Sequence, residues 1–213
     1  MSDQTIVHLL RHGEVHNPGK VLYGRLPDFH LSELGRAMAD KVATAIGERD
    51  IVLVVASPLE RAQETAAPLA ARRSLEIATD PNLIEADNVF EGKQVSVGDG
   101  VLRQPKYWRH LVNPFRPSWG EPYVEVAARM RAAITAAREQ AHGHEAVLVS
   151  HQLPVWIARL DAEQRRFFHD PRHRQCTLAS LTSLTFDGND LVAITYSEPA
   201  AALLPGSSKI AGA

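Results

Sequence analysis

Three short apolar runs constrain the fold of this chain more than any other feature. Residues 5–10, 51–55 and 146–150 are mostly apolar, too short for helices, and each is followed within two residues by a polar residue. Continuous apolar runs of this length are typical of strands that are covered on both faces. Because helix-like segments separate the runs, we expect right-handed crossovers between parallel strands. The predicted fold class is α/β, a three-layer α/β/α sandwich with a mostly parallel central sheet.

The segments between these runs carry helix and turn signals. Ser32 is a candidate N-cap for a helix that ends near Gly47, and Pro58 opens a second helix over about 59–72. The remaining signals predict helices over about 121–141 and 153–160 and a hairpin turn at 187–190. We expect residues 1–198 to form one domain. Residues 86–120 would be a lid-like insertion over the site, and residues 199–213 a flexible tail.

Four basic or titratable side chains follow the ends of the expected strands. Arg11 and His12 follow the first strand, Arg61 lies in the first turn of the helix after the second, and His151 follows the third. Parallel strands end at one edge of an open α/β sheet, where ligands bind, so we expect these groups to meet. Arginine binds phosphate oxygens with a planar fork of donors, and neutral imidazole can carry a phosphoryl group. The pattern predicts a phosphate site.

Glu85 is the candidate proton donor. A carboxyl group near the phosphate can protonate a leaving oxygen and later activate water. A surface acid on a loop is the alternative reading of the same residue. Histidine pairs with i,i+4 spacing, such as His169 and His173, lack a carboxylate–histidine ligand pattern, so we expect no metal site.

Composition narrows the range of partners. A net charge of −2 and a pI near 6.5 give no electrostatic reason to expect nucleic acid or an anionic membrane. No run approaches transmembrane length, the first residues do not resemble a signal peptide, and Cys176 is the only cysteine. We therefore expect a cytoplasmic protein with a small phosphorylated substrate. A homodimer is left open.

The motifs at these positions resemble those of a known family. The matching segments are Leu10-Arg11-His12-Gly13-Glu14, Leu31-Ser32-Glu33-Leu34-Gly35, Ser57-Pro58-Leu59-Glu60-Arg61-Ala62-Gln63-Glu64-Thr65-Ala66, Leu83-Ile84-Glu85 with Phe90-Glu91-Gly92, and Val149-Ser150-His151. They extend over most of the chain in the expected order. In combination they resemble the histidine phosphatase superfamily, in its phosphoglycerate mutase-like branch.

The resemblance implies a phosphoglycerate mutase-like fold and a covalent phosphohistidine mechanism. His12 would attack phosphorus in line, and Glu85 would act first as general acid and then as base for water. The phosphoryl oxygens would be held by the remaining matched residues, Arg11, Arg61, His151 and Asn17.

The chain departs from the family pattern in three ways. Gln152 stands where glycine usually follows the second histidine, so its side chain is a candidate substrate contact. The segment from Glu85 to Glu91-Gly92 is one residue shorter than usual, and Phe90 takes the place of a tryptophan. The chain is also short for a cofactor-dependent mutase, which favours a phosphatase.

Three functions stay open on these residues. The leading one is a metal-independent phosphomonoesterase with no cofactor, and the second is a phosphoglycerate mutase, which would need a 2,3-bisphosphoglycerate primer. The third is a non-catalytic phospholigand-binding protein, which would need neither His12 nor Glu85 as a reacting group. In the insertion, where aromatic residues are mixed with cations, Arg109 or Arg116 is the expected substrate contact; the alternative is that the aromatics only anchor the loop.

Overall fold

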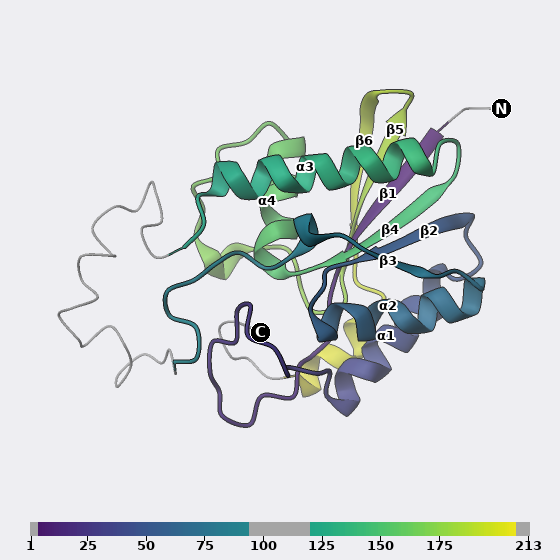
Figure 1. The fold of residues 1–213 in the computed structure, drawn as a ribbon. Helices are drawn as coiled ribbons and strands as arrows, with labels where there is room; N and C mark the ends of the chain where they lie inside the picture. Colours follow the sequence, from purple (N-terminus) through teal and green to yellow (C-terminus); the bar gives the residue numbers. More distant parts are fainter. Residues whose placement is uncertain (1–3, 94–119, 208–213) are drawn as a thin grey trace.

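The computed structural model describes residues 4–93 and 120–207 and is built around one six-stranded sheet (Figure 1). The strand order is β3-β2-β4-β1-β5-β6. The strands are β1 Gln4–Arg11, β2 Ile51–Ala56, β3 Ile77–Thr79, β4 Glu145–Ser150, β5 Leu181–Asp187 and β6 Asp190–Ser197. From β3 to β1 the neighbours pair in parallel, whereas β5 and β6 form an antiparallel hairpin beside β1. The expected α/β class with a mostly parallel sheet is confirmed.

Helices cover both faces of the sheet, which confirms the three-layer arrangement (Figure 1). α1 (Glu33–Ile46) and α2 (Glu60–Arg73) pack together on one face. α3 (Tyr123–Gln140) and α4 (Gln152–Ala162) pack together on the other. Short 3-10 helices, η1 (Pro81–Leu83) and η4 (Pro171–His173), lie in the loops near one end of the sheet.

The central strands are apolar on both faces because each face has its own core. In β1, Val7 and Leu9 belong to the core under α3 and α4, whereas Leu10 belongs to the core under α1 and α2. Val147 and Leu148 of β4 divide between the two cores in the same way. Alternation of side chains along a strand therefore produces a continuous apolar run when both faces are covered.

The expected element ends agree with the structure to within about three residues. Ser32 caps α1, and its Oγ accepts a hydrogen bond from the N–H of Gly35 (2.9 Å). The turn between β5 and β6 includes Gly188 in the left-handed region (φ +57°), where glycine is favoured.

The expectation of a flexible tail from residue 199 needs correction for the residues that the structure describes. Ala201–Gly206 form a 3-10 helix, η5, and Ala200 is 2% exposed. Leu203 and Leu204 pack against the core under α1 and α2. A segment rich in small residues tends to fray, but here the two leucine side chains are held by apolar contacts with that core. Residues 208–213 lie outside the described part.

Of the expected lid-like insertion, the structure describes residues 86–93 and 120. Asn88 and Gly120 form an isolated antiparallel bridge, and Phe90 is buried. Arg109 and Arg116, the expected substrate contacts, lie outside the described residues. Within residues 4–93 and 120–207, no helix has the length and apolarity needed to cross a membrane.

Candidate active site

The two histidines at the strand ends meet because β1 and β4 are neighbours. Arg11, the last residue of β1, is in register with Ser150, the last residue of β4. The N–H of His12 donates to the carbonyl of Ser150 (3.0 Å), and the ring centroids of His12 and His151 lie 5.1 Å apart. Arg61 enters the same region from the first turn of α2. The expected grouping of Arg11, His12, Arg61 and His151 at one sheet edge is what the structure contains.

His12 is held in one tautomer. Its Nδ1 lies 2.7 Å from the carbonyl oxygen of Gly13, which can only accept, so Nδ1 carries the proton. Burial and the charges of Arg61 and Arg11 lower the pKa of His12 well below its ordinary value, although the bond to Gly13 acts in the opposite direction. At neutral pH the ring is therefore uncharged, and the lone pair on Nε2 is free to act as a nucleophile.

Arg61 offers donors for an anion. The side chain is fully buried, its Nη2 donates to the carbonyl of Gly24 (2.5 Å), and its guanidinium carbon lies 4.7 Å from the ring centroid of Tyr23. Within the described residues, Nε and Nη1 of Arg61 have no hydrogen-bond partner. Buried donors are rarely left without a partner, so an oxyanion from a ligand is a suitable acceptor.

His151 lies beside His12 at the same edge of the sheet. Its Nε2 lies 2.8 Å from Oγ of Ser57, and its Nδ1 has no partner in the part of the chain that the structure describes. Burial, followed by the charge of Arg61, lowers the pKa of His151 well below its ordinary value. Two neutral imidazoles therefore lie close to the fixed positive charge of Arg61.

The loop after His12 is fixed to α2 by a hydroxyl relay. The N–H of Gly13 donates to Oγ1 of Thr65 (3.1 Å), which in turn donates to the carbonyl of Arg61 (2.6 Å). Thr65 is 1% exposed, so water does not compete for these bonds. The backbone beside His12 is therefore tied to α2, the helix that carries Arg61.

The same loop is fixed to α1 by close backbone packing. The hydroxyl of Ser32 donates to Oε2 of Glu14 (2.6 Å), and the N–H of Ser32 donates to the Glu14 carbonyl (2.9 Å). A Cβ on Gly35 would lie 2.0 Å from that carbonyl oxygen, and one on Gly13 would lie 2.6 Å from the carbonyl of Gly35. Glycine at both positions permits this approach.

Glu85 lies after η1 and lines a cavity of about 180 Å³, whose wall also includes Gln152, the residue directly after His151. Burial raises the pKa of Glu85, and the hydrogen bond from the N–H of Ala86 and the charges of Arg61 and Arg174 offset this only in part. A carboxyl group with a raised pKa keeps its proton to higher pH, as a general acid requires.

A second layer of ion pairs holds the backbone of Glu85. Nε of Arg25 donates to the Glu85 carbonyl (2.7 Å), and Nη2 of Arg25 donates to Glu121 (2.9 Å). Arg129 on α3 also pairs with Glu121 (2.8 Å) and donates to the carbonyl of Asn82. Residues from three separate segments thus fix the position of the expected proton donor.

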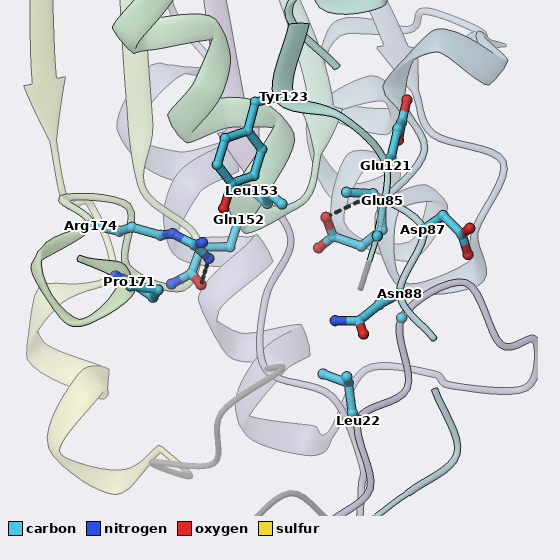
Figure 2. A pocket seen from close by; sticks show the side chains of 13 residues that line it. Leu22, Glu85, Asp87, Asn88, Glu121, Tyr123, Gln152, Leu153, Pro171 and Arg174 are labelled. Carbon is cyan, nitrogen blue, oxygen red and sulfur yellow. Dashed lines mark hydrogen bonds between the residues drawn. The ribbon is translucent and has the colours of Figure 1, made fainter. Parts of the chain in front are cut away.

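Gln152 lies in the cavity wall, whereas Asn17 is occupied within its own loop. Gln152 begins α4 directly after His151 and lines the same cavity as Glu85 (Figure 2). The side chain of Asn17 donates to the carbonyl of Val21 (2.8 Å) and accepts from its N–H (3.2 Å). These bonds stabilise the loop after His12, and a phosphate contact of Asn17 stays a prediction.

Sequence reasoning missed Tyr23 and Arg174. The Tyr23 ring packs edge-on to His12, with centroids 6.4 Å apart, and its hydroxyl is buried without a partner within the described residues. Burial raises the pKa of Tyr23 to about 12, so the hydroxyl stays a donor. Arg174 lines the cavity across from Glu85. Neither lies at a strand end or in a recognised motif, and only tertiary packing brings them to the site.

No group of three or more His, Cys, Asp or Glu side chains within residues 4–93 and 120–207 is arranged to hold a metal ion. His169 of the expected i,i+4 pairs is instead bonded to the carbonyl of Phe167 (2.6 Å) and to Nε of Arg174 (2.8 Å).

Comparison with known proteins gives a consistent family. The model of the histidine phosphatase superfamily (branch 1) matches residues 7–198. The protein Rv0525 of Mycobacterium tuberculosis is 60% identical over 201 residues, which cover 94% of this chain and 100% of the relative. A probable phosphoglycerate mutase, GpmB of Yersinia pestis, is 33% identical over 155 residues, 70% of each chain.

A solved structure shares the fold. The native structure of the mycobacterial glucosyl-3-phosphoglycerate phosphatase Rv2419c superposes with a TM-score of 0.69 at 26% identity, covering 91% of this chain and 96% of that one. This superposition and the family-model match over residues 7–198 lead to the same family as the motifs at the strand ends. The chain therefore belongs to the histidine phosphatase superfamily (branch 1) and, like the members of that superfamily, is a phosphatase or a phosphoglycerate mutase.

Proposed function

We propose that the protein is a metal-independent phosphomonoesterase that acts on a small phosphorylated metabolite through a phosphohistidine at His12. The observation that carries this proposal is the bond from Nδ1 of His12 to the Gly13 carbonyl, which leaves the lone pair on Nε2. Beside it, the buried donors of Arg61 have no partner within the described residues. Donors fixed in place before the reaction stabilise the charge that develops on phosphoryl oxygens.

In the first step, Nε2 of His12 attacks phosphorus and the bond from phosphorus to the leaving oxygen breaks. Glu85 gives its proton to that oxygen, so the product leaves as a neutral hydroxyl. The ring of His12 keeps its Nδ1 proton, and the Gly13 carbonyl stabilises the positive charge that the ring gains. Arg11 and Arg61 neutralise the phosphoryl oxygens.

In the second step, water attacks the phosphoryl group from the side that the product has left. Glu85, now a carboxylate, takes a proton from the water, and the bond between phosphorus and Nε2 breaks. Inorganic phosphate leaves, and His12 and Glu85 return to their starting protonation states.

A phosphoglycerate mutase is the second candidate, since a relative with 33% identity bears that name. In this case the phosphoryl group on His12 would pass to a hydroxyl of a second substrate rather than to water, and a bisphosphorylated primer would load the histidine. The name of the structurally similar Rv2419c supports the phosphatase instead.

The test is turnover of phosphate esters without added metal by the wild type, His12→Ala and a control, His16→Ala. His16 lies on the same loop with an exposed side chain, so its loss should not disturb the site. The panel contains p-nitrophenyl phosphate and 3-phosphoglycerate, the latter with and without 2,3-bisphosphoglycerate. Rapid quenching in alkali followed by intact-mass measurement looks for a phosphoryl adduct.

We expect phosphate release and the adduct in the wild type and in His16→Ala, and neither in His12→Ala. Primer-dependent isomerisation without release of phosphate would favour the mutase. Phosphate release that persists in His12→Ala would contradict both candidates.

A further inference from the structure

Arg174 is a cation that faces the cavity beside Glu85. Its Nε donates to Nε2 of His169 (2.8 Å), and its Nη1 donates to Oε1 of Gln152 (3.3 Å). In Figure 2, Arg174 and Gln152 lie on one side of the cavity, and Glu85 lies on the other. The guanidinium thus shares a hollow with the group expected to protonate the leaving oxygen.

Arg174 has no counter-ion in the part of the chain that the structure describes. Neighbouring arginines differ in this respect: Arg172 pairs with Asp170 (2.6 Å), and Arg159 pairs with Glu163 (2.8 Å). Both hydrogen-bond acceptors of Arg174 are neutral groups, an imidazole and an amide. Burial lowers the pKa of Arg174, which reflects the cost of keeping its charge there. An anionic ligand would remove that cost.

The position of Arg174 is prepared by its neighbours. Nδ1 of His169 donates to the carbonyl of Phe167 (2.6 Å), so Nε2 is the acceptor that receives the Arg174 proton. The His169 ring lies against Tyr123 and Trp156, with centroids 5.7 and 5.9 Å away. Such support fixes the orientation of the guanidinium before a ligand arrives.

The direction of the reaction assigns this cation to the leaving half of the substrate. The phosphoryl group lies at His12, and Glu85 must reach the oxygen that connects it to the rest of the molecule. The cavity that Glu85 shares with Arg174 therefore receives what is attached to that oxygen. With two nitrogens of Arg174 already bonded and Asp87 also in the cavity wall, a group with one negative charge suits the site better than a second phosphate.

We propose that Arg174 is a specificity-determining residue that binds a carboxylate on the leaving half of the substrate, and that Gln152 and His169 position it. The inference rests on the proposed function for the role of Glu85. It also explains the side chain at position 152, because a glycine directly after His151 would leave Nη1 of Arg174 without this acceptor.

Two esters that differ in one group test the proposal. 3-Phosphoglycerate carries a carboxylate where glycerol 3-phosphate carries a hydroxymethyl group. Arg174→Gln should lower kcat/KM for 3-phosphoglycerate by about 10- to 100-fold, which is the usual contribution of a hydrogen bond to a charged group. The same variant should change kcat/KM for glycerol 3-phosphate by about twofold or less. The matched control is Arg172→Gln, whose side chain is 85% exposed and should leave both values unchanged.

Binding separates this inference from the proposed function. Dissociation constants for both esters are measured by calorimetry in His12→Ala, alone and combined with Arg174→Gln, so that no turnover is needed. If the wild type hydrolyses neither ester but Arg174→Gln still removes a preference for 3-phosphoglycerate, the inference stands and the phosphatase proposal fails. An equal loss for both esters, or no loss for either, overturns the inference.

A second variant guards against a folding defect in Arg174→Gln. Gln152→Gly keeps the guanidinium but removes its acceptor, and it should weaken the preference for the carboxylate in the same direction. Unchanged selectivity in Gln152→Gly, with Arg174→Gln unable to fold, would also overturn the inference.

Discussion

Replacing Glu145 by Gln should lower the stability of the protein without changing its chemistry. Glu145 begins β4, at the end of the strand opposite His151. Its Oε2 accepts from Nε2 of His8 (2.8 Å) and from Nε of Arg49 (2.6 Å), and its Oε1 accepts from Nη2 of Arg49 (3.0 Å). These bonds connect β1, β4 and the turn before β2.

The size of the effect follows from the acidity of this carboxyl group. Burial alone would raise the pKa of Glu145, but the bonds from His8 and Arg49 lower it from 4.5 to about 2. That difference corresponds to about 3 kcal/mol if it is fully expressed in folding. Because the Arg49 side chain is 45% exposed and solvent screens the pair, we expect about 1–2 kcal/mol. For a chain of this size, the midpoint would fall by about 2–8 °C.

The sign of the pH dependence is fixed by the same values. A carboxyl group with a lower pKa in the folded state stabilises the protein fully above pH 4.5, and this contribution is lost as the pH falls towards 2. Thermal melting of the wild type and Glu145→Gln should therefore differ at pH 7, differ less at pH 3, and converge only as the pH falls to about 2. Asp161→Asn, which removes an exposed ion pair with Arg131, is the control, with an expected cost below about 1 kcal/mol. Equal stability of Glu145→Gln and the wild type at pH 7, or a gap that does not narrow in acid, would refute the reasoning.

Four other outcomes are expected. Glu85→Gln should slow phosphate release at least about 100-fold, because the variant has no proton to donate to the leaving oxygen. It should also have a higher melting temperature than the wild type at pH 8, because burial raises the pKa of Glu85 and its ionised form destabilises the fold above that pKa. The difference in melting temperature should disappear below pH 4.5, and a variant less stable than the wild type at pH 8 would count against this. For the same reason, wild-type turnover should fall at high pH as Glu85 loses its proton, whereas a flat profile would point to another donor. EDTA should leave the phosphatase activity intact, because in the proposed mechanism Arg11 and Arg61 supply the positive charge that neutralises the phosphoryl oxygens. A loss of activity in EDTA that a divalent ion restores would contradict the mechanism. Gly35→Ala should lower the free energy of unfolding by about 1–3 kcal/mol, because its Cβ would lie 2.0 Å from the carbonyl oxygen of Glu14. Denaturant titration measures this change, and an unchanged unfolding midpoint would show that the loop can move to accept the Cβ.

The strand ends could be predicted from sequence, and with them the meeting of His12, Arg61 and His151. Continuous apolar runs locate parallel strands, and parallel strands bring their following residues to one edge, so local pattern was sufficient. The cap at Ser32 could be predicted for a similar reason, because its bond to Gly35 spans three residues.

The rest depended on contacts between distant segments. Arg174 lies in an irregular loop. Its proposed role rests on the lack of a counter-ion within the described residues and on its bonds to Gln152 and His169. A local sequence pattern encodes none of these contacts. The raised pKa of Glu85 likewise comes from burial, and burial depends on how the loops close around it. The packing of Leu203 and Leu204 was missed because the sequence of a short apolar segment does not show whether the folded protein has an apolar surface that it can cover.

The strand order has a consequence for how the enzyme comes into being during synthesis. β1, which His12 directly follows, leaves the ribosome before the other described strands, whereas both of its partners in the sheet, β4 and β5, follow β2 and β3 in the chain. Until β4 has emerged, His12 has neither the Ser150 carbonyl that receives its N–H nor the second imidazole beside it. A nascent chain that already contains His12, Arg61 and Glu85 therefore still lacks part of the proposed phosphate site. The candidate site can therefore be completed only after β4 has been synthesised and has paired with β1.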